Sequence, residues 1–211
     1  MDGIYSFLNL LLPFEWAEFD FMKNALLAVL MITPLFGLTG TMIVNNKMSF
    51  FSDALGHSAM TGIALGVVLE VRNELVCLIA FGVLMALLIN KVRAGGTAST
   101  DTVISVFSST ALALGLLLLS KYQGVSKYSA YLVGDILSVS RQEVVLLFIA
   151  LLVVGGVWCA VYNKLLLISV NRSLAASRGV RVVLYENIFS VMVAVAVSYT
   201  HLRAHETTLH L

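Results

Sequence analysis

Residues 45–66 read NNKMSFFSDALGHSAMTGIALG, an apolar segment that carries one acid, Asp53, and one histidine, His57. Side chains four residues apart lie one turn above each other on the same face of a helix, and both of these residue types bind metal ions. Small residues recur at the same interval, which is the small-xxx-small spacing of closely packed membrane helices; they are Ala54, Ser58, Gly62 and Gly66. The segment therefore predicts a tightly packed membrane helix with a polar pair beside the contact.

The composition of the whole chain supports this interpretation. Of the 211 residues, 59% are hydrophobic and 12% are charged, and the mean hydropathy of +0.95 is too high for a soluble domain of this size. The net charge of +1 comes without the basic cluster that a nucleic-acid partner would require. We therefore expect an integral membrane protein, embedded in lipid, that binds no nucleic acid.

Apolar runs long enough, or nearly long enough, to cross the hydrocarbon core occur six times. They are Phe21–Val44, the Asp53 helix as far as Val71, Leu75–Val92, Thr102–Ser120, Val144–Tyr162 and a sixth run from Val182 to about Ser198. A seventh apolar piece, Ala130–Leu137, is too short to cross and is expected to form a half-helix. We predict an all-α membrane protein with about six transmembrane helices, the second of which is capped by Ser49 or Ser52.

The positive-inside rule, which counts lysine and arginine in short loops, gives the orientation. Seven of these residues fall in the loops 45–52, 91–101 and 163–181, which would share one side; they are Lys47, Lys91, Arg93, Lys164, Arg172, Arg178 and Arg181. That side is assigned to the cytoplasm, so the N-terminus faces outward. Residues 1–20 carry four acids and no base, the reverse of a signal peptide, and are interpreted as an interfacial segment.

The pair of Asp53 and His57 has two interpretations. A carboxylate in the bilayer centre costs at least about 2.5–3.5 kcal/mol on insertion scales, so such residues usually mark a transport pathway or a relay. Alternatively, Asp53 only caps the helix start and His57 bonds to a neighbouring carbonyl group. One carboxylate and one imidazole leave the four-ligand shell of zinc incomplete, and a symmetric dimer would supply a second pair. Asp101 has the same ambiguity, because an acid at a helix start is commonly a cap.

The segment Met48–Gly62 resembles the signature segment of the ABC-3 family, the membrane permeases of zinc and manganese ABC importers. Three further stretches match in the same order. Asp101–Gly115 resembles the acid-led fourth helix of the family, Tyr131–Ser140 its external half-helix, and Leu174–Gly179 its cytoplasmic coupling segment. Together these matches cover residues 20–197.

This resemblance implies a bacterial plasma-membrane permease that pairs as a homodimer, binds two cytoplasmic ABC ATPase subunits and receives metal from an extracytoplasmic binding protein. The metal-pathway residues of the family correspond to Asp53 and His57. The coupling helix corresponds to Asn171–Val180, in which we expect Asn171, Leu174, Ala175 and Gly179 to mediate coupling to the ATPase. The transported Zn²⁺ or Mn²⁺ is a substrate, no permanently bound cofactor is expected, and the chain itself is not an enzyme.

Two other classes remain open. A proton-coupled secondary transporter would use the Asp53–His57 pair as a relay, although such proteins usually contain an inverted repeat and the motif has no second copy here. An intramembrane hydrolase would need a nucleophile, for which Ser52 or Ser58 beside His57 is a weak candidate. The sequence contains no phosphate-binding loop, so any ATP hydrolysis would belong to a separate subunit.

The end of the chain, residues 198–211, departs abruptly from the preceding pattern and is similar to a translated sequencing adapter. We therefore expect a non-native tail at 198–211. On this interpretation, residues 1–197 form an incomplete permease domain without the later helices of the family fold.

Overall fold

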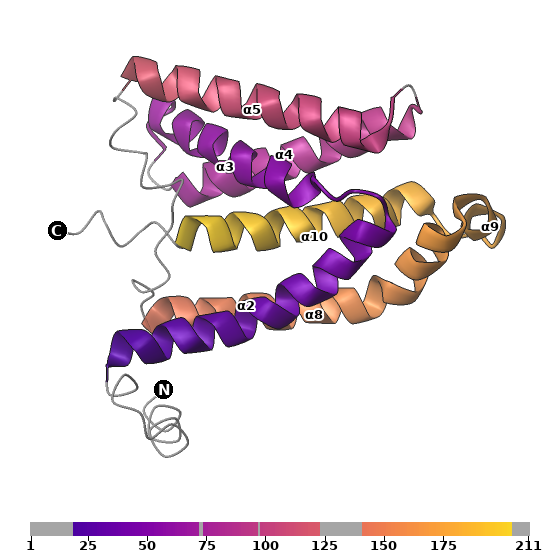
Figure 1. Ribbon diagram of the computed structural model, residues 1–211, viewed down its shortest axis with the longest axis horizontal. Coiled ribbons are helices and arrows are strands. Elements are labelled where there is room, and N and C mark those ends of the chain that lie inside the picture. Colours follow the sequence, from indigo (N-terminus) through magenta and orange to yellow (C-terminus); the bar gives the residue numbers. More distant parts are fainter. Residues whose placement is uncertain (1–18, 72–73, 97, 123–140, 204–211) are drawn as a thin grey trace.

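The computed structural model describes residues 19–71, 74–96, 98–122 and 141–203, and all regular structure in these ranges is helical (Figure 1). The helices are α2 (Asp20–Asn45), α3 (Phe51–Val68), α4 (Glu74–Ala94), α5 (Thr100–Tyr122), α8 (Arg141–Val170), α9 (Arg172–Ser177) and α10 (Val182–Arg203). The prediction of an all-α protein is confirmed. The half-helix expected at 130–137 and the interfacial segment expected at 1–18 lie outside the described residues.

The long helices run between the same two ends of one bundle. Within the described ranges, α2, α4, α5 and α8 are long and apolar enough to cross a membrane. α3 is not among them, and α10 contains a shorter apolar stretch, Val182–Ser198. Figure 1 shows α3 and α4 between α5 and α10, with α2 and α8 together on the other side of α10. Six long helices therefore lie where the six spans were predicted, and four of them are long and apolar enough to be candidate membrane spans.

The basic connections lie at one end of this bundle, as the charge pattern predicts. The α2–α3 connection, the α4–α5 connection and α9 all lie at the right of Figure 1. Two helices continue well past their predicted ends. α10 continues to Arg203, past the end predicted at about Ser198, and α8 continues to Val170, whereas its end was predicted at Tyr162. Asn163 and Lys164 do not stop the helix because the apolar residues after them continue it, and a lysine stem can extend along the helix to water.

The start of α3 is fixed by packing and not by a serine cap. The predicted cap at Ser49 or Ser52 is wrong, because the N-cap residue is Phe50 and no side chain bonds there. Met48 and Phe51 are buried on either side of it. Before them, Lys47 adopts a positive φ of 54°, and the amides of Lys47 and Met48 donate to Val44 and Ile43. This bonding pattern is a Schellman ending of α2, here built without the usual glycine.

The core is organised around α3, which approaches two neighbours with almost no side chain between the backbones. A Cβ added at Gly62 would lie 2.6 Å from Cα of Leu78 in α4. On the α5 side, a Cβ at Gly115 would lie 2.9 Å from Oγ1 of Thr61. The Thr61 hydroxyl also donates to the carbonyl oxygen of Ala111 in α5. Glycines thus allow both contacts.

Gly62→Ala is expected to destabilise the bundle, because the added methyl group forces α3 and α4 apart. Overpacking of this kind costs about 1–3 kcal/mol, which exceeds the gain of about 1 kcal/mol from the higher helix propensity of alanine. Thermal unfolding of the purified protein in detergent measures the effect. Gly37→Ala in α2 is the control, because no atom lies within 4 Å of its added Cβ, and it should be neutral or stabilising. Equal stability of the two variants would contradict the predicted α3–α4 contact.

Candidate functional site

Asp53 and His57 approach each other on the exposed face of α3. Nε2 of His57 lies 3.5 Å from Oδ2 of Asp53, and the exposed fractions of the two side chains are 35% and 63%. A carboxylate oxygen and an imidazole nitrogen one turn apart can bind the same metal ion. No group of three His, Cys, Asp or Glu side chains that could hold a metal occurs among the described residues. The pair therefore offers two of the four donors that a zinc shell would need, and both side chains are partly exposed.

The depth of this pair differs from a position at the bilayer centre. Asp53 lies in the first turn of α3, directly after the α2–α3 connection at the basic end of the bundle (Figure 1). Burying its charge is therefore less costly than at mid-span, because the penalty falls toward the membrane surface. The pair therefore lies toward the end of the bundle that carries the basic connections.

The small residues of α3 occupy the neighbouring, buried face of the helix. Ala54, Ser58, Gly62 and Gly66 are all buried. Gly62 makes the contact with α4 described above, and the hydroxyl of Ser58 donates to the carbonyl oxygen of Leu55 at 2.7 Å. Because it is fully buried and already bonded within the helix, Ser58 is a poor nucleophile candidate, which disfavours the hydrolase alternative.

The predicted coupling segment forms the short helix α9, and the expected residues define both of its ends. The Asn171 side chain accepts a hydrogen bond of 2.9 Å from the Leu174 amide and caps the helix start. Gly179 ends the segment with φ of 76°, a left-handed conformation that glycine adopts without a Cβ clash. Ala175 is buried against Ile168, Val180 and Val182, while Leu174 is exposed. The segment is therefore anchored by the buried Ala175 and exposes the apolar side chain of Leu174.

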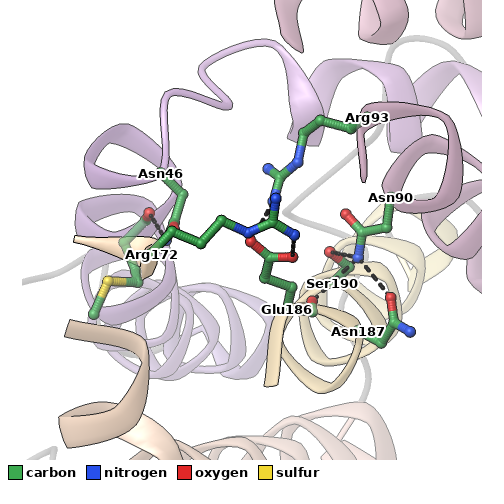
Figure 2. A network of polar contacts seen from close by, with 8 residues as sticks. Asn46, Asn90, Arg93, Arg172, Glu186, Asn187 and Ser190 are labelled. Carbon is green, nitrogen blue, oxygen red and sulfur yellow. Dashed lines mark hydrogen bonds and ion pairs between the residues drawn. The ribbon is translucent and has the colours of Figure 1, made fainter. Parts of the chain in front are cut away.

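A charged cluster beside α9 was not predicted from the sequence. Glu186 of α10 lies 3.2 Å from an Nη of Arg93 in α4 and 3.1 Å from an Nη of Arg172 in α9 (Figure 2). One turn deeper, the Asn90 amide of α4 donates to Oδ1 of Asn187 and to Oγ of Ser190 in α10. Arg93 and Asn90 are separated from their partners in α10 by 93 to 100 residues along the chain, so local sequence patterns carry no signal for these contacts.

Asp101, the other candidate acid, lies in the first turn of α5. The cap of this helix is Ser99, whose hydroxyl accepts a hydrogen bond of 3.2 Å from the Thr102 amide. An acid in a first helical turn is favoured by the helix dipole. Its position is thus explained without a role in transport.

The bundle of membrane-length helices with an accessible acid–histidine pair defines a multi-pass membrane protein of the permease class. A family model described as the ABC 3 transport family matches residues 18–203. The chain belongs to this family, as the sequence motifs predicted, and is a multi-pass protein of the bacterial plasma membrane.

Individual relatives agree with the family assignment. The chain is 32% identical to the manganese import system permease protein ScaB of Streptococcus parasanguinis, over 91% of this chain and 68% of that protein. It is 24% identical to the high-affinity zinc uptake system membrane protein ZnuB of Haemophilus influenzae, over 85% of this chain and 69% of that protein. The fold is similar to that of PsaBC from Streptococcus pneumoniae in complex with Fab, with a TM-score of 0.72 and 24% identity. The match covers 95% of this chain and 70% of the chain in that structure.

Asn171→Ala is expected to loosen α9, because it removes the only side-chain bond recorded at the cap of this helix. The loss of an asparagine cap costs about 0.5–2 kcal/mol, so amide hydrogen exchange of residues 172–177 should accelerate. Ser173→Ala serves as the control, since no described residue bonds to the Ser173 side chain. Unchanged exchange in Asn171→Ala would contradict the capping role.

Proposed function

We propose that this chain is the permease subunit of an ABC importer that moves a divalent transition metal, zinc or manganese, into the cytoplasm. The Asp53–His57 pair carries the proposal, because it supplies one oxygen and one nitrogen donor within hydrogen-bonding range of each other in the signature segment of the family. The names of the relatives, one a manganese and one a zinc permease, support both metals. The substrate is the ion itself, taken from an extracytoplasmic binding protein.

The incomplete shell favours a homodimer. Two donors are too few for zinc, which takes four ligands, or for manganese, which takes more. A two-fold axis beside α3 would bring a second Asp53 and a second His57 to the same ion, giving a set of two oxygens and two nitrogens. The exposure of both side chains in the single chain fits an interface or passage at this face. Release toward the basic end would then deliver the metal to the cytoplasm.

The proposed mechanism is alternating access driven by a separate subunit. Two cytoplasmic ATPase subunits would dock on α9, where Leu174 is exposed, and ATP-driven closure would displace this segment. The movement would open the Asp53–His57 pair toward one side of the membrane at a time. The residues of this chain bind, orient and release the ion, while ATP hydrolysis takes place on the partner.

Asp53→Ala and His57→Ala are each expected to abolish metal accumulation while the ATPase still associates with the permease. Loss of an outer-shell partner already costs about 10–100-fold in metal affinity, so loss of a direct ligand should cost at least about 100-fold. Equilibrium binding and cellular uptake of Zn²⁺ and Mn²⁺ measure this. Asp101→Asn is the matched control, an acid in a first helical turn without a histidine one turn later, and should transport normally. Normal uptake by both alanine variants would remove the pair from the pathway.

Uptake is also expected to depend on a co-expressed ATPase and to survive the collapse of the proton gradient. The comparison is made in vesicles that contain the permease with an active or a hydrolysis-deficient ATPase, with and without a protonophore. If the protonophore abolished uptake while ATPase activity had no influence, the protein would be a proton-coupled secondary transporter that uses the Asp53–His57 pair as a relay.

A further inference from the structure

Glu186 lies where three separate helices meet at the basic end of the bundle. Its two carboxylate oxygens contact different arginines: Oε1 faces Arg93 of α4 and Oε2 faces Arg172 of α9 (Figure 2). A single side chain of α10 thus connects the predicted coupling helix to two membrane helices.

The two ion pairs differ in exposure. The exposed fractions are 12% for Glu186 and 15% for Arg93, but 51% for Arg172. The pair with Arg93 is shielded from water, and shielded pairs are screened less by salt than exposed ones. Arg93 therefore holds Glu186 firmly, whereas Arg172 is the partner that can exchange its contact for water.

A polar pocket of about 270 Å³ adjoins the cluster and gives the Arg172 side chain room to move. Its walls come from the ends of several helices, and they include Lys47 between α2 and α3, Thr100 at the start of α5 and Ser169 near the end of α8. Displacement of Arg172 would therefore change the surroundings of the other residues that line this pocket.

We propose that Glu186 is the joint that carries a displacement of α9 into α4 and α10. The inference rests on the proposed function, in which α9 receives the movement of an ATPase. The apolar packing of α9 comes from one small side chain, Ala175, which contacts mainly residues close to α9 in sequence. The Arg172–Glu186 pair adds a charge-assisted hydrogen bond between α9 and α10, about twice as strong as a neutral one. The hydrogen bonds of Asn90 to Asn187 and Ser190 connect α4 to α10.

The test uses the full chain assembled with its ATPase in proteoliposomes, with Zn²⁺ or Mn²⁺ as the transported ion. In Glu186→Gln we expect the number of metal ions carried per ATP hydrolysed to fall by roughly tenfold, within the range found for residues that couple distant sites. Metal affinity and ATPase association should remain unchanged, because neither Asp53 nor the exposed Leu174 is altered. Arg172→Gln should reduce the same ratio, and Arg172→Lys, which keeps the charge, should reduce it less.

Arg181→Gln is the matched control, because Arg181 is an exposed arginine just outside the coupling segment and forms no ion pair with a described residue. An unchanged ratio in Glu186→Gln, or an equal loss in Arg181→Gln, would overturn the joint while leaving metal transport intact. Failure of the unsubstituted complex to carry metal would instead overturn the proposed function, and the joint with it. Thermal unfolding shows whether each variant folds. If Glu186→Gln does not fold, the transport ratio of Arg172→Gln tests the joint instead, because the half-exposed Arg172 side chain can be replaced with little effect on folding.

Discussion

The close approach of α3 to both α4 and α5 is the constraint on which the rest of the structure depends. Membrane helices gain no hydrophobic free energy by associating, so they need close backbone contact and interhelical hydrogen bonds. Gly62 allows close backbone contact with α4. On the α5 side, Gly115 allows a close contact and Thr61 donates an interhelical hydrogen bond. These contacts fix the rotation of α3 about its axis. Because successive residues are about 100° apart, burial of Ala54 and Ser58 leaves Asp53 and His57 on an adjacent, open face.

The sequence was sufficient to predict the helices and the acid–histidine pair, because both are local patterns. Apolar length predicts spans, and four-residue spacing places Asp53 beside His57 whatever the neighbours are. The end of α8 was missed because two polar residues, Asn163 and Lys164, resemble a loop start when the helix around them is unknown. The metal-binding role of the pair, the coupling role of α9 and the division of the chain at residue 197 stay predictions.

The Glu186 cluster could not be predicted for a different reason. A lone acid near the start of an apolar helix has many possible interpretations, and only the folded bundle brings Arg93 and Arg172 to it. A buried ion pair is weak evidence for stability, because desolvation offsets much of the attraction. Apolar packing of similar size would hold α4 and α10 together equally well. In the proposed function, the cluster would instead connect elements that must stay in register while α9 moves.

The position of this cluster also bears on how the ion would be released. Asn46 and Lys47, which end α2, line the pocket beside Glu186, and α3 begins only a few residues later at Phe51. Lys47 holds a left-handed backbone conformation, which costs a residue with a Cβ about 1–2 kcal/mol and makes this connection tight. In the proposed function, a displacement at the pocket would therefore reach the first turn of α3, where Asp53 lies, without having to pass through the length of the bundle. An energy input at α9 and a metal site at the Asp53–His57 pair, both at the same end of the bundle, would need only a small local movement to release the ion.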